Sequence, residues 1–409
     1  MTYRSRLTVP LIAALAGLIV GCRDQEPPTV GHERSTWITE PEFRLGNTPE
    51  GAYFTLPYVR VDPGRNRVLV LDGMEVSVWT PSGHLLFVVG GEGDGPGEFR
   101  RPGALFVHDG GGFTVPDQYG ARMTRFAASG ELLEAEQGPG GRVSYQGFSL
   151  VLASSKDGIF LGHPSIPTGL ETNMPGVRRM DHHPVVRVQE SEPGHWHPPE
   201  PLLWQDVRNR TQDVRLTESR GFYTAQPFGD WDEVVFEPGA VLVVRRNREP
   251  GQVELVEVSA TGDTVWHRYL QFEPRLLTAQ VIEQVSEEFI RDYAARSAMS
   301  VPMVRAAYYE SLYQPEYVPA VEGKPVLAAS GEVWLASTEV ADTFSVYYVV
   351  GRGTTNEPPR RVLLPEGMYV TDATSTHAWG FLRDETDVPY VVGRRLVGWS
   401  ADAQRPDGA

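Results

Sequence analysis

The sequence predicts an all-β fold, a six-bladed β-propeller of four-stranded antiparallel blades with a short helical insertion. Short β-rich runs separated by Gly, Pro, Asn and Asp turns recur along most of the 409 residues. The first two groups of four runs also repeat with a spacing of 45 to 47 residues. A period of this length with four strands per unit is typical of propeller blades, which bury their faces by stacking around an axis.

The first two blades are the clearest. Turn signals separate the runs within each blade, and these signals have known backbone chemistry. Pro57 and Pro102 are 45 residues apart, and so are Asp72 and Asp117. The runs of the first blade lie at 59–61, 68–71, 76–79 and 85–89, and those of the second at 105–107, 113–115, 123–126 and 132–133.

A glycine-rich segment joins these two blades and ends in Gly-Pro-Gly-Glu-Phe at residues 95–99. With Val115-Pro116-Asp117 and the Phe126 to Gly130 turn, it resembles the NHL-repeat family and related six-bladed propeller lipoproteins. We expect Phe99 to fill the gap between neighbouring sheets. We expect Asp72 and Asp117 to bond turn amides rather than a ligand, because Asp commonly does so in turns.

The later blades are less regular. A strand from the N-terminus, at residues 42–45, is expected to complete the last blade, because an open ring would leave exposed sheet edges. The propeller is thus predicted to span residues 42–398. The later strand clusters lie at 148–161, 234–265, 326–350 and 378–392.

One segment, at about 276–313, breaks the β pattern. Apolar residues four apart predict an amphipathic helix over 278–296, on the face of Val281, Val285, Phe289 and Tyr293. A second helix is predicted over 302–312, with Ser300 as its cap. The segment is interpreted either as an insertion packed on one propeller face or as a lid or partner-binding helix over the central opening.

The N-terminus predicts export. Residues 1–21 have the basic, apolar and small-residue layout of a signal peptide, and the apolar part is too short to span a bilayer. Ile19-Val20-Gly21-Cys22 resembles the bacterial lipobox, which implies lipidation of Cys22 and a membrane anchor. Arg23 follows Cys22 where inner-membrane lipoproteins of enterobacteria often carry Asp, so an outer-membrane location in the cell envelope is favoured. Residues 22–41 are then a lipidated flexible tether, and 399–409 a disordered tail.

Composition excludes several classes of function. With 37 basic and 53 acidic residues, the chain has a net charge of −16, which argues against nucleic acid as a partner. A single cysteine cannot form an internal disulfide and leaves no thiol for catalysis once Cys22 is lipidated. The sequence lacks the spacings of serine hydrolases, zinc proteases, phosphate-binding loops and calcium loops. No catalytic, cofactor-binding or metal-binding residue is assigned, and a monomer is expected.

Histidines cluster in a Pro-rich segment at about 164–205. His182, His183, His195 and His197 could bind a metal if they folded together. No carboxylates or thiols are spaced around them as in a known site, which favours a surface loop, with Trp196 and Trp204 pinning it to the body.

Two function classes remain. The first is a binding or scaffolding module of the envelope, with a protein, a polymer or a ligand as partner, and the missing catalytic motifs favour it. The alternative is a metal-dependent hydrolase or lyase, similar to lactonases and amidating lyases, with calcium or zinc in the central channel. A propeller fold by itself does not decide between them.

Overall fold

The computed structural model describes residues 36–46, 53–117, 122–137, 148–154, 159–164, 181–192, 195–246, 248–339, 341, 343–353 and 357–398. The predicted signal peptide, Cys22, the tether up to residue 35 and the 399–409 tail lie outside the described residues.

The first two sheets confirm the repeat that the sequence predicts. In each, four antiparallel strands pair in sequence order. Gly73 and Gly83 hold positive φ angles of 58° and 83° at the turns, a conformation that glycine adopts without steric cost. The strands are β2 (Tyr58–Asp62), β3 (Arg67–Asp72), β4 (Glu75–Trp79) and β5 (Leu85–Gly90), then β6 (Phe106–Val107), β7 (Phe113–Asp117), β8 (Arg122–Phe126) and β9 (Leu132–Gln137), with a 3-10 turn at Pro63–Arg65.

The next two sheets follow along the chain. The third contains β10 (Phe148–Ser154), β11 (Ile159–Pro164), β12 (His182–Glu192), β13 (His195–Trp196) and β14 (Glu200–Asp206), with both β13 and β14 paired to β12. The fourth contains β17 (Glu233–Glu237), β18 (Ala240–Arg246), β19 (Gln252–Ser259) and β20 (Thr264–Gln271). The strand clusters predicted at 148–161 and 234–265 are therefore confirmed.

The surface loop predicted at 164–205 is wrong for its described part, which forms β12 to β14. Two prolines misled the interpretation, because proline usually interrupts a central strand. Pro184 lies inside β12 opposite Trp204, and Pro201 lies in β14 opposite Val186, where the pairing register shifts. Both prolines are accommodated in the pairing of these two strands.

The remaining strands form one eight-stranded sheet made of two four-stranded halves. β1 (Thr36–Leu45) pairs with β29 along most of its length in antiparallel fashion, and with β26 in parallel only at Thr36 and Trp37. The predicted completion of the last blade by an N-terminal strand is confirmed. The strand begins at Thr36, however, so residues 36–41, predicted as tether, belong to the sheet. The halves are β23 (Val321–Leu327), β24 (Glu332–Ser337), β25 (Phe344–Gly351) and β26 (Arg360–Pro365), and then β27 (Tyr369–Ala373), β28 (His377–Arg383), β29 (Pro389–Gly398) and β1.

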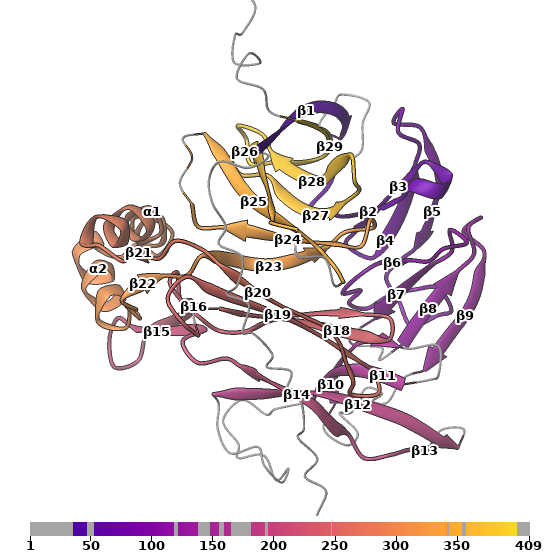
Figure 1. The fold of residues 1–409 in the computed structure, drawn as a ribbon, viewed down its shortest axis with the longest axis horizontal. Coiled ribbons are helices and arrows are strands. Elements are labelled where there is room, and N and C mark those ends of the chain that lie inside the picture. Colours follow the sequence, from indigo (N-terminus) through magenta and orange to yellow (C-terminus); the bar gives the residue numbers. More distant parts are fainter. Residues whose placement is uncertain are drawn as a thin grey trace, which may run out of the picture.

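The sheets have a propeller-like arrangement (Figure 1). Contacts run in a cycle from β2 to β6, β7 to β10, β10 to β17, β17 to β23, β23 to β27 and back to β2. The apolar core lies between neighbouring sheets, as stacking of thin sheets requires. Phe99 is fully buried among residues of the first two sheets, so its predicted place between them is confirmed.

Both predicted helices are present, as α1 (Ala279–Ser297) and α2 (Val301–Glu310). Thr278 caps α1 by accepting a bond from the Val281 amide at 3.4 Å, whereas the Ser300 side chain makes no such bond to α2. A short pairing of β21 (Arg275–Leu276) with β22 (Tyr317–Val318) closes the insertion at its base. Neither helix has the combination of length and apolar character that crossing a bilayer would need, as far as the described residues go.

The helices pack on a separate hairpin, β15 (Thr211–Arg215) and β16 (Gly221–Ala225), at the side of the ring (Figure 1). The interpretation that they pack directly on a propeller face is therefore corrected. The buried positions of α1 are Ser286, Ile290 and Ala294, while Val285 of the predicted apolar face remains 47% exposed. Val285 faces a different part of the molecule, the cavity described next.

Candidate functional site

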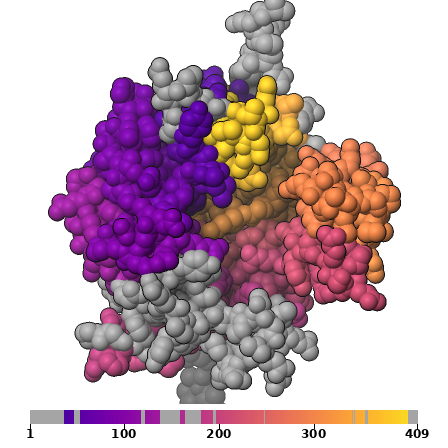
Figure 2. Space-filling model, turned by 180° about the vertical axis from the view of Figure 1, so that it is seen from behind, coloured from indigo at the N-terminus to yellow at the C-terminus, as the bar shows by residue number. Residues whose placement is uncertain are grey.

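A cavity of about 1250 Å³ lies where the innermost strands meet. β2, β6, β17, β23 and β27 all contribute to its wall, and so do Val281, Gln284 and Val285 of α1. The face seen in Figure 2 has a recess where the N-terminal, middle and C-terminal segments meet. The helical insertion thus borders the central space through α1.

Strand alternation explains why the wall is partly polar. In β17, Val234 and Phe236 are buried in the core shared with the third sheet. Glu233 and Glu237 alternate with them and are half-buried at the cavity wall. Both carboxylates have cationic partners, Arg246 for Glu233 at 3.6 Å and Arg352 for Glu237 at 2.8 Å.

Arg60 and Asp372 form a structural pair beside the cavity. Asp372 is fully buried and accepts bonds from the backbone amides of Val61, Ala329 and Ala373 at 2.8 to 2.9 Å. The Arg60 guanidinium lies 3.5 Å from its carboxylate. Burial raises the pKa of Asp372, and Arg60 and the three amides oppose that shift. With three amides on Asp372 and the Leu327 carbonyl on Arg60, the pair joins strands rather than offering a group to a ligand.

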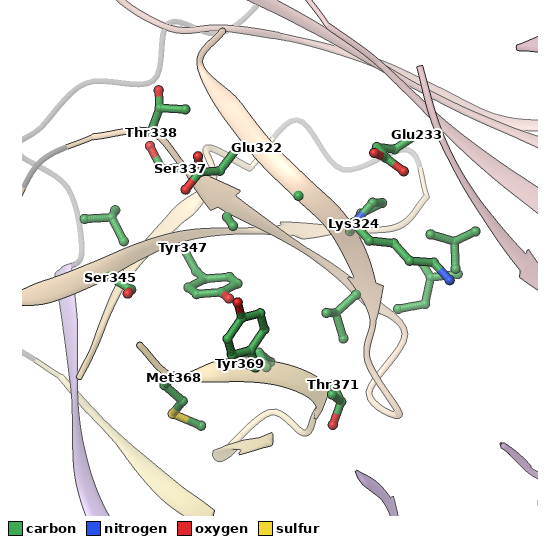
Figure 3. Close-up of a pocket in the computed structure, with 18 of the residues that line it drawn as sticks. Glu233, Glu322, Lys324, Ser337, Thr338, Ser345, Tyr347, Met368, Tyr369 and Thr371 are labelled. Atoms are coloured by element: carbon green, nitrogen blue, oxygen red, sulfur yellow. The ribbon is translucent and has the colours of Figure 1, made fainter. Parts of the chain in front are cut away.

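Inside the described part of the chain, five charged residues of the wall make no ion pair within 4.0 Å: Lys324 and Glu322 on β23, Arg210 in the turn before β15, Arg275 on β21 and Glu366 after β26. Arg275 donates instead to the carbonyl and hydroxyl oxygens of Thr338. Figure 3 shows Glu322 and Lys324 on the same strand at the cavity. Glu322 and Lys324 both keep exposed surface on the cavity side. The surrounding walls nevertheless raise the pKa of Glu322 by desolvation, and Arg246 and Arg275 lower it in part.

His163, on β11, also lines the cavity. Its ring meets Phe236 edge-on at 5.3 Å, and its Nδ1 lies 3.4 Å from the Pro184 carbonyl oxygen. Because a carbonyl can only accept, Nδ1 carries the proton and Nε2 keeps a lone pair. Burial lowers the pKa of His163 to about 4, and the nearby charges of Arg210 and Lys324 act in the same direction. The ring is therefore neutral at neutral pH.

Two tyrosines, Tyr347 on β25 and Tyr369 on β27, form another part of the wall. Figure 3 shows the hydroxyls of Tyr347 and Tyr369 directed toward one another, with Met368 below them. Tyr347 packs on Trp334 with ring centroids 6.2 Å apart, and Tyr369 stacks on Phe381 at 5.0 Å. Burial raises the pKa of Tyr347 to about 12, so its hydroxyl stays protonated and able to donate a hydrogen bond.

The residues singled out by sequence lie elsewhere. Asp72 bonds the amides of Thr55 and Leu56, and Asp117 those of Arg100 and Arg101, so their predicted turn-bonding role is confirmed. The candidate histidines lie on or just after β12 and β13, away from the cavity wall. In the described ranges, no three His, Asp, Glu or Cys side chains come close enough to hold a metal ion.

The cavity residues escaped sequence reasoning, because strand spacing does not reveal which loop faces the axis. One signal was available. Lys324 is one of only two lysines in a chain whose 37 basic residues are otherwise arginine. A residue type used so sparingly, at a Gly-Lys-Pro step inside a strand, marks an unusual position.

No family model and no curated protein matches the chain. Many solved structures resemble it, among them the following three at 12 to 13% identity. A Bacteroides fragilis protein whose name describes it as exported has a TM-score of 0.45 at 12% identity and covers 90% of this chain and 100% of its own. A gluconolactonase of Xanthomonas campestris has a TM-score of 0.37 at 13% identity and covers 88% of this chain and 97% of its own. Virginiamycin B lyase of Staphylococcus aureus has a TM-score of 0.37 at 12% identity and covers 87% of this chain and 98% of its own. At these scores the likenesses carry no conclusion about function.

Proposed function

We propose that this chain is a binding protein of the bacterial envelope whose axial cavity holds a small ligand. The observation that supports it is the cavity itself, because ligand sites are commonly concave spaces of about 300–1,000 Å³ with a few polar groups. Here strands far apart in the sequence bring to one space two tyrosine hydroxyls and several charges that form no ion pair within the described ranges. The groups that hold the ring together, such as Asp372, already have their bonding partners, so the free ones are available to a ligand.

A cavity-filling variant tests the proposal. Ser345 lies on the cavity wall in β25, and Ser345→Trp would place a large ring in the space. A panel of amino acids, sugars and aromatic acids is screened by thermal shift on the full chain in detergent. We expect hits that stabilise the wild type and the control Ser219→Trp, on an exposed turn, but not Ser345→Trp. Hits that stabilise Ser345→Trp equally would place binding elsewhere and refute the proposal.

We also infer that the ring comprises six NHL-like blades. Counting the eight-stranded sheet as two blades is supported by its two halves of four strands and by the two-residue contact between β1 and β26. A crystal structure in which β26 and β1 pair along their whole length would refute this count.

The lipid anchor is a proposal from the sequence, supported by the Leu18 to Cys22 segment. We expect the wild-type chain to fractionate with the outer membrane and to be labelled by radioactive palmitate. We expect the Cys22→Ala variant to show neither property. The control Thr29→Ala should behave as wild type. Palmitate-free wild-type protein in the soluble fraction would contradict the anchor.

A further inference from the structure

Lys324 owes its place in the cavity to an irregularity of β23. Between the pairs Glu322–Ala336 and Val326–Trp334, β23 advances four residues while β24 advances two. The extra residues form a bulge, and Gly323 takes a positive φ of 61° that a side chain would make costly. Bulges redirect side chains and are frequent next to functional sites. The bulge therefore indicates that the fold sets the direction of the Lys324 side chain.

The bulge is held from both sides. The Arg246 side chain, only 2% exposed, donates a hydrogen bond to the Gly323 carbonyl and stacks over Trp231 at 5.3 Å. Pro325, on the other side of Lys324, is buried. The hydrogen bond from this buried arginine holds the backbone of the bulge in place. Lys324 therefore extends into the cavity from a fixed backbone position (Figure 3).

Positive charge gathers around this end of the cavity. Lys324 and Arg210 line the same cavity as His163, and both cations lie close enough to that ring to lower its pKa. Neither cation has an ion-pair partner within 4.0 Å among the residues that the structure describes. In a chain with 53 acidic residues, two cations on one cavity wall without an ion pair are unusual. The pKa of Glu322, on the same strand as Lys324, is lowered by the charges of Arg246 and Arg275.

We infer that Lys324 and Arg210 bind the anionic group of a small organic acid, with the rest of the ligand against Tyr347, Tyr369 and Met368. The two cations attract the anion and the neutral His163 adds a polar contact, while the tyrosine wall suits an aromatic or apolar remainder. This inference rests on the proposed function and adds the ligand class to it.

The scarcity of lysine makes a direct test practical. Reductive methylation of the detergent-solubilised full chain with ¹³C-formaldehyde labels Lys324, Lys156 and any free N-terminal amine, and keeps the positive charge. Lys156→Arg assigns the two lysine signals. The probes are benzoate and phenyl phosphate, with benzamide as the neutral isostere of benzoate. We expect at least one anion to shift the Lys324 signal with saturation and to leave Lys156 unmoved, whereas benzamide shifts neither.

Variants connect the signal to affinity. Lys324→Gln and Arg210→Gln should each weaken binding of the anion roughly ten- to hundred-fold, the range of a charged hydrogen bond. Lys324→Arg should retain most of it, and the exposed control Arg296→Gln should change nothing.

The outcomes separate the two claims. If benzamide binds as well as benzoate, and Ser345→Trp abolishes both, the cavity binds ligands but the anion inference is wrong. The same holds if the anions bind without moving Lys324. If neither anion binds, the inference is overturned, and binding that survives Ser345→Trp overturns the proposed function as well.

Discussion

Replacing Asp372 by Asn tests how the ring is joined at its axis. Oδ1 accepts the amides of Ala329 and Ala373, and Oδ2 accepts the amide of Val61 and faces Arg60. An Asn side chain can keep the two bonds at Oδ1. Its NH₂ group would then meet the Val61 N–H and the Arg60 guanidinium, both of which are donors. The variant therefore leaves the buried Val61 amide without its acceptor and Arg60 without its ion-pair partner, although Arg60 keeps its bond to the Leu327 carbonyl.

The expected loss is about 3–5 kcal/mol, because removing one partner of a buried ion pair leaves the other uncompensated. The assay is urea unfolding followed by tryptophan fluorescence, where a lower midpoint with an unchanged slope reports lost stability. Asp263→Asn, on an exposed turn, is the matched control and should change stability by less than about 0.5 kcal/mol. A loss below about 1 kcal/mol in Asp372→Asn would show that the stability of the ring does not depend on the bonds of this carboxylate to the Val61, Ala329 and Ala373 amides.

Three further predictions concern packing and pH. Phe99→Ala should cost about 3–5 kcal/mol in urea unfolding, because Phe99 is fully buried between two sheets, whereas Tyr53→Ala, at a 73% exposed residue, should cost little. The ring centroids of Phe43 in β1 and Trp379 lie 5.3 Å apart, and Phe43→Ala removes this contact. The variant should speed hydrogen exchange in β1 and β29 more than in other strands. Equal acceleration in all strands would contradict this. The pKa of His163 is about 4 in the folded state and about 6.5 in the unfolded state. Its contribution to the free energy of unfolding is therefore fully present above pH 6.5, and it falls by up to about 3 kcal/mol as the pH drops toward 4. The difference in stability between wild type and His163→Gln should therefore change over that range, and a constant difference would refute it.

Regular repeats made the first part of the fold predictable. Residues 57–133 carry alternating apolar positions and turn glycines at constant spacing, so local chemistry alone specifies β2 to β9. The helices were equally readable, because Val281, Phe289 and Tyr293 recur at helical spacing. In both cases the signal lies in neighbouring residues.

Tertiary contacts decided the rest. Pro184 and Pro201 signal loops locally, yet packing of the third sheet overrides that preference and keeps both in strands. Val285 matches the apolar helix face but faces the cavity, because the β15–β16 hairpin selects Ile290 and Ala294 instead. The Lys324 bulge depends on Arg246, a residue 78 positions earlier, and short-range patterns do not contain that information.

The pairing of β1 with β29 also constrains how the molecule is made. Thr39 and Arg394, joined by a hydrogen bond, are 355 residues apart, so β1 must wait for β29 to be synthesised. Bringing such distant segments together carries a large entropic cost before any contact compensates for it. Until translation ends, β1 and the growing β28 edge remain open to other chains. A ribosome that stops before residue 389 would therefore release an aggregation-prone product, and quality control should recognise it by these two unpaired edges.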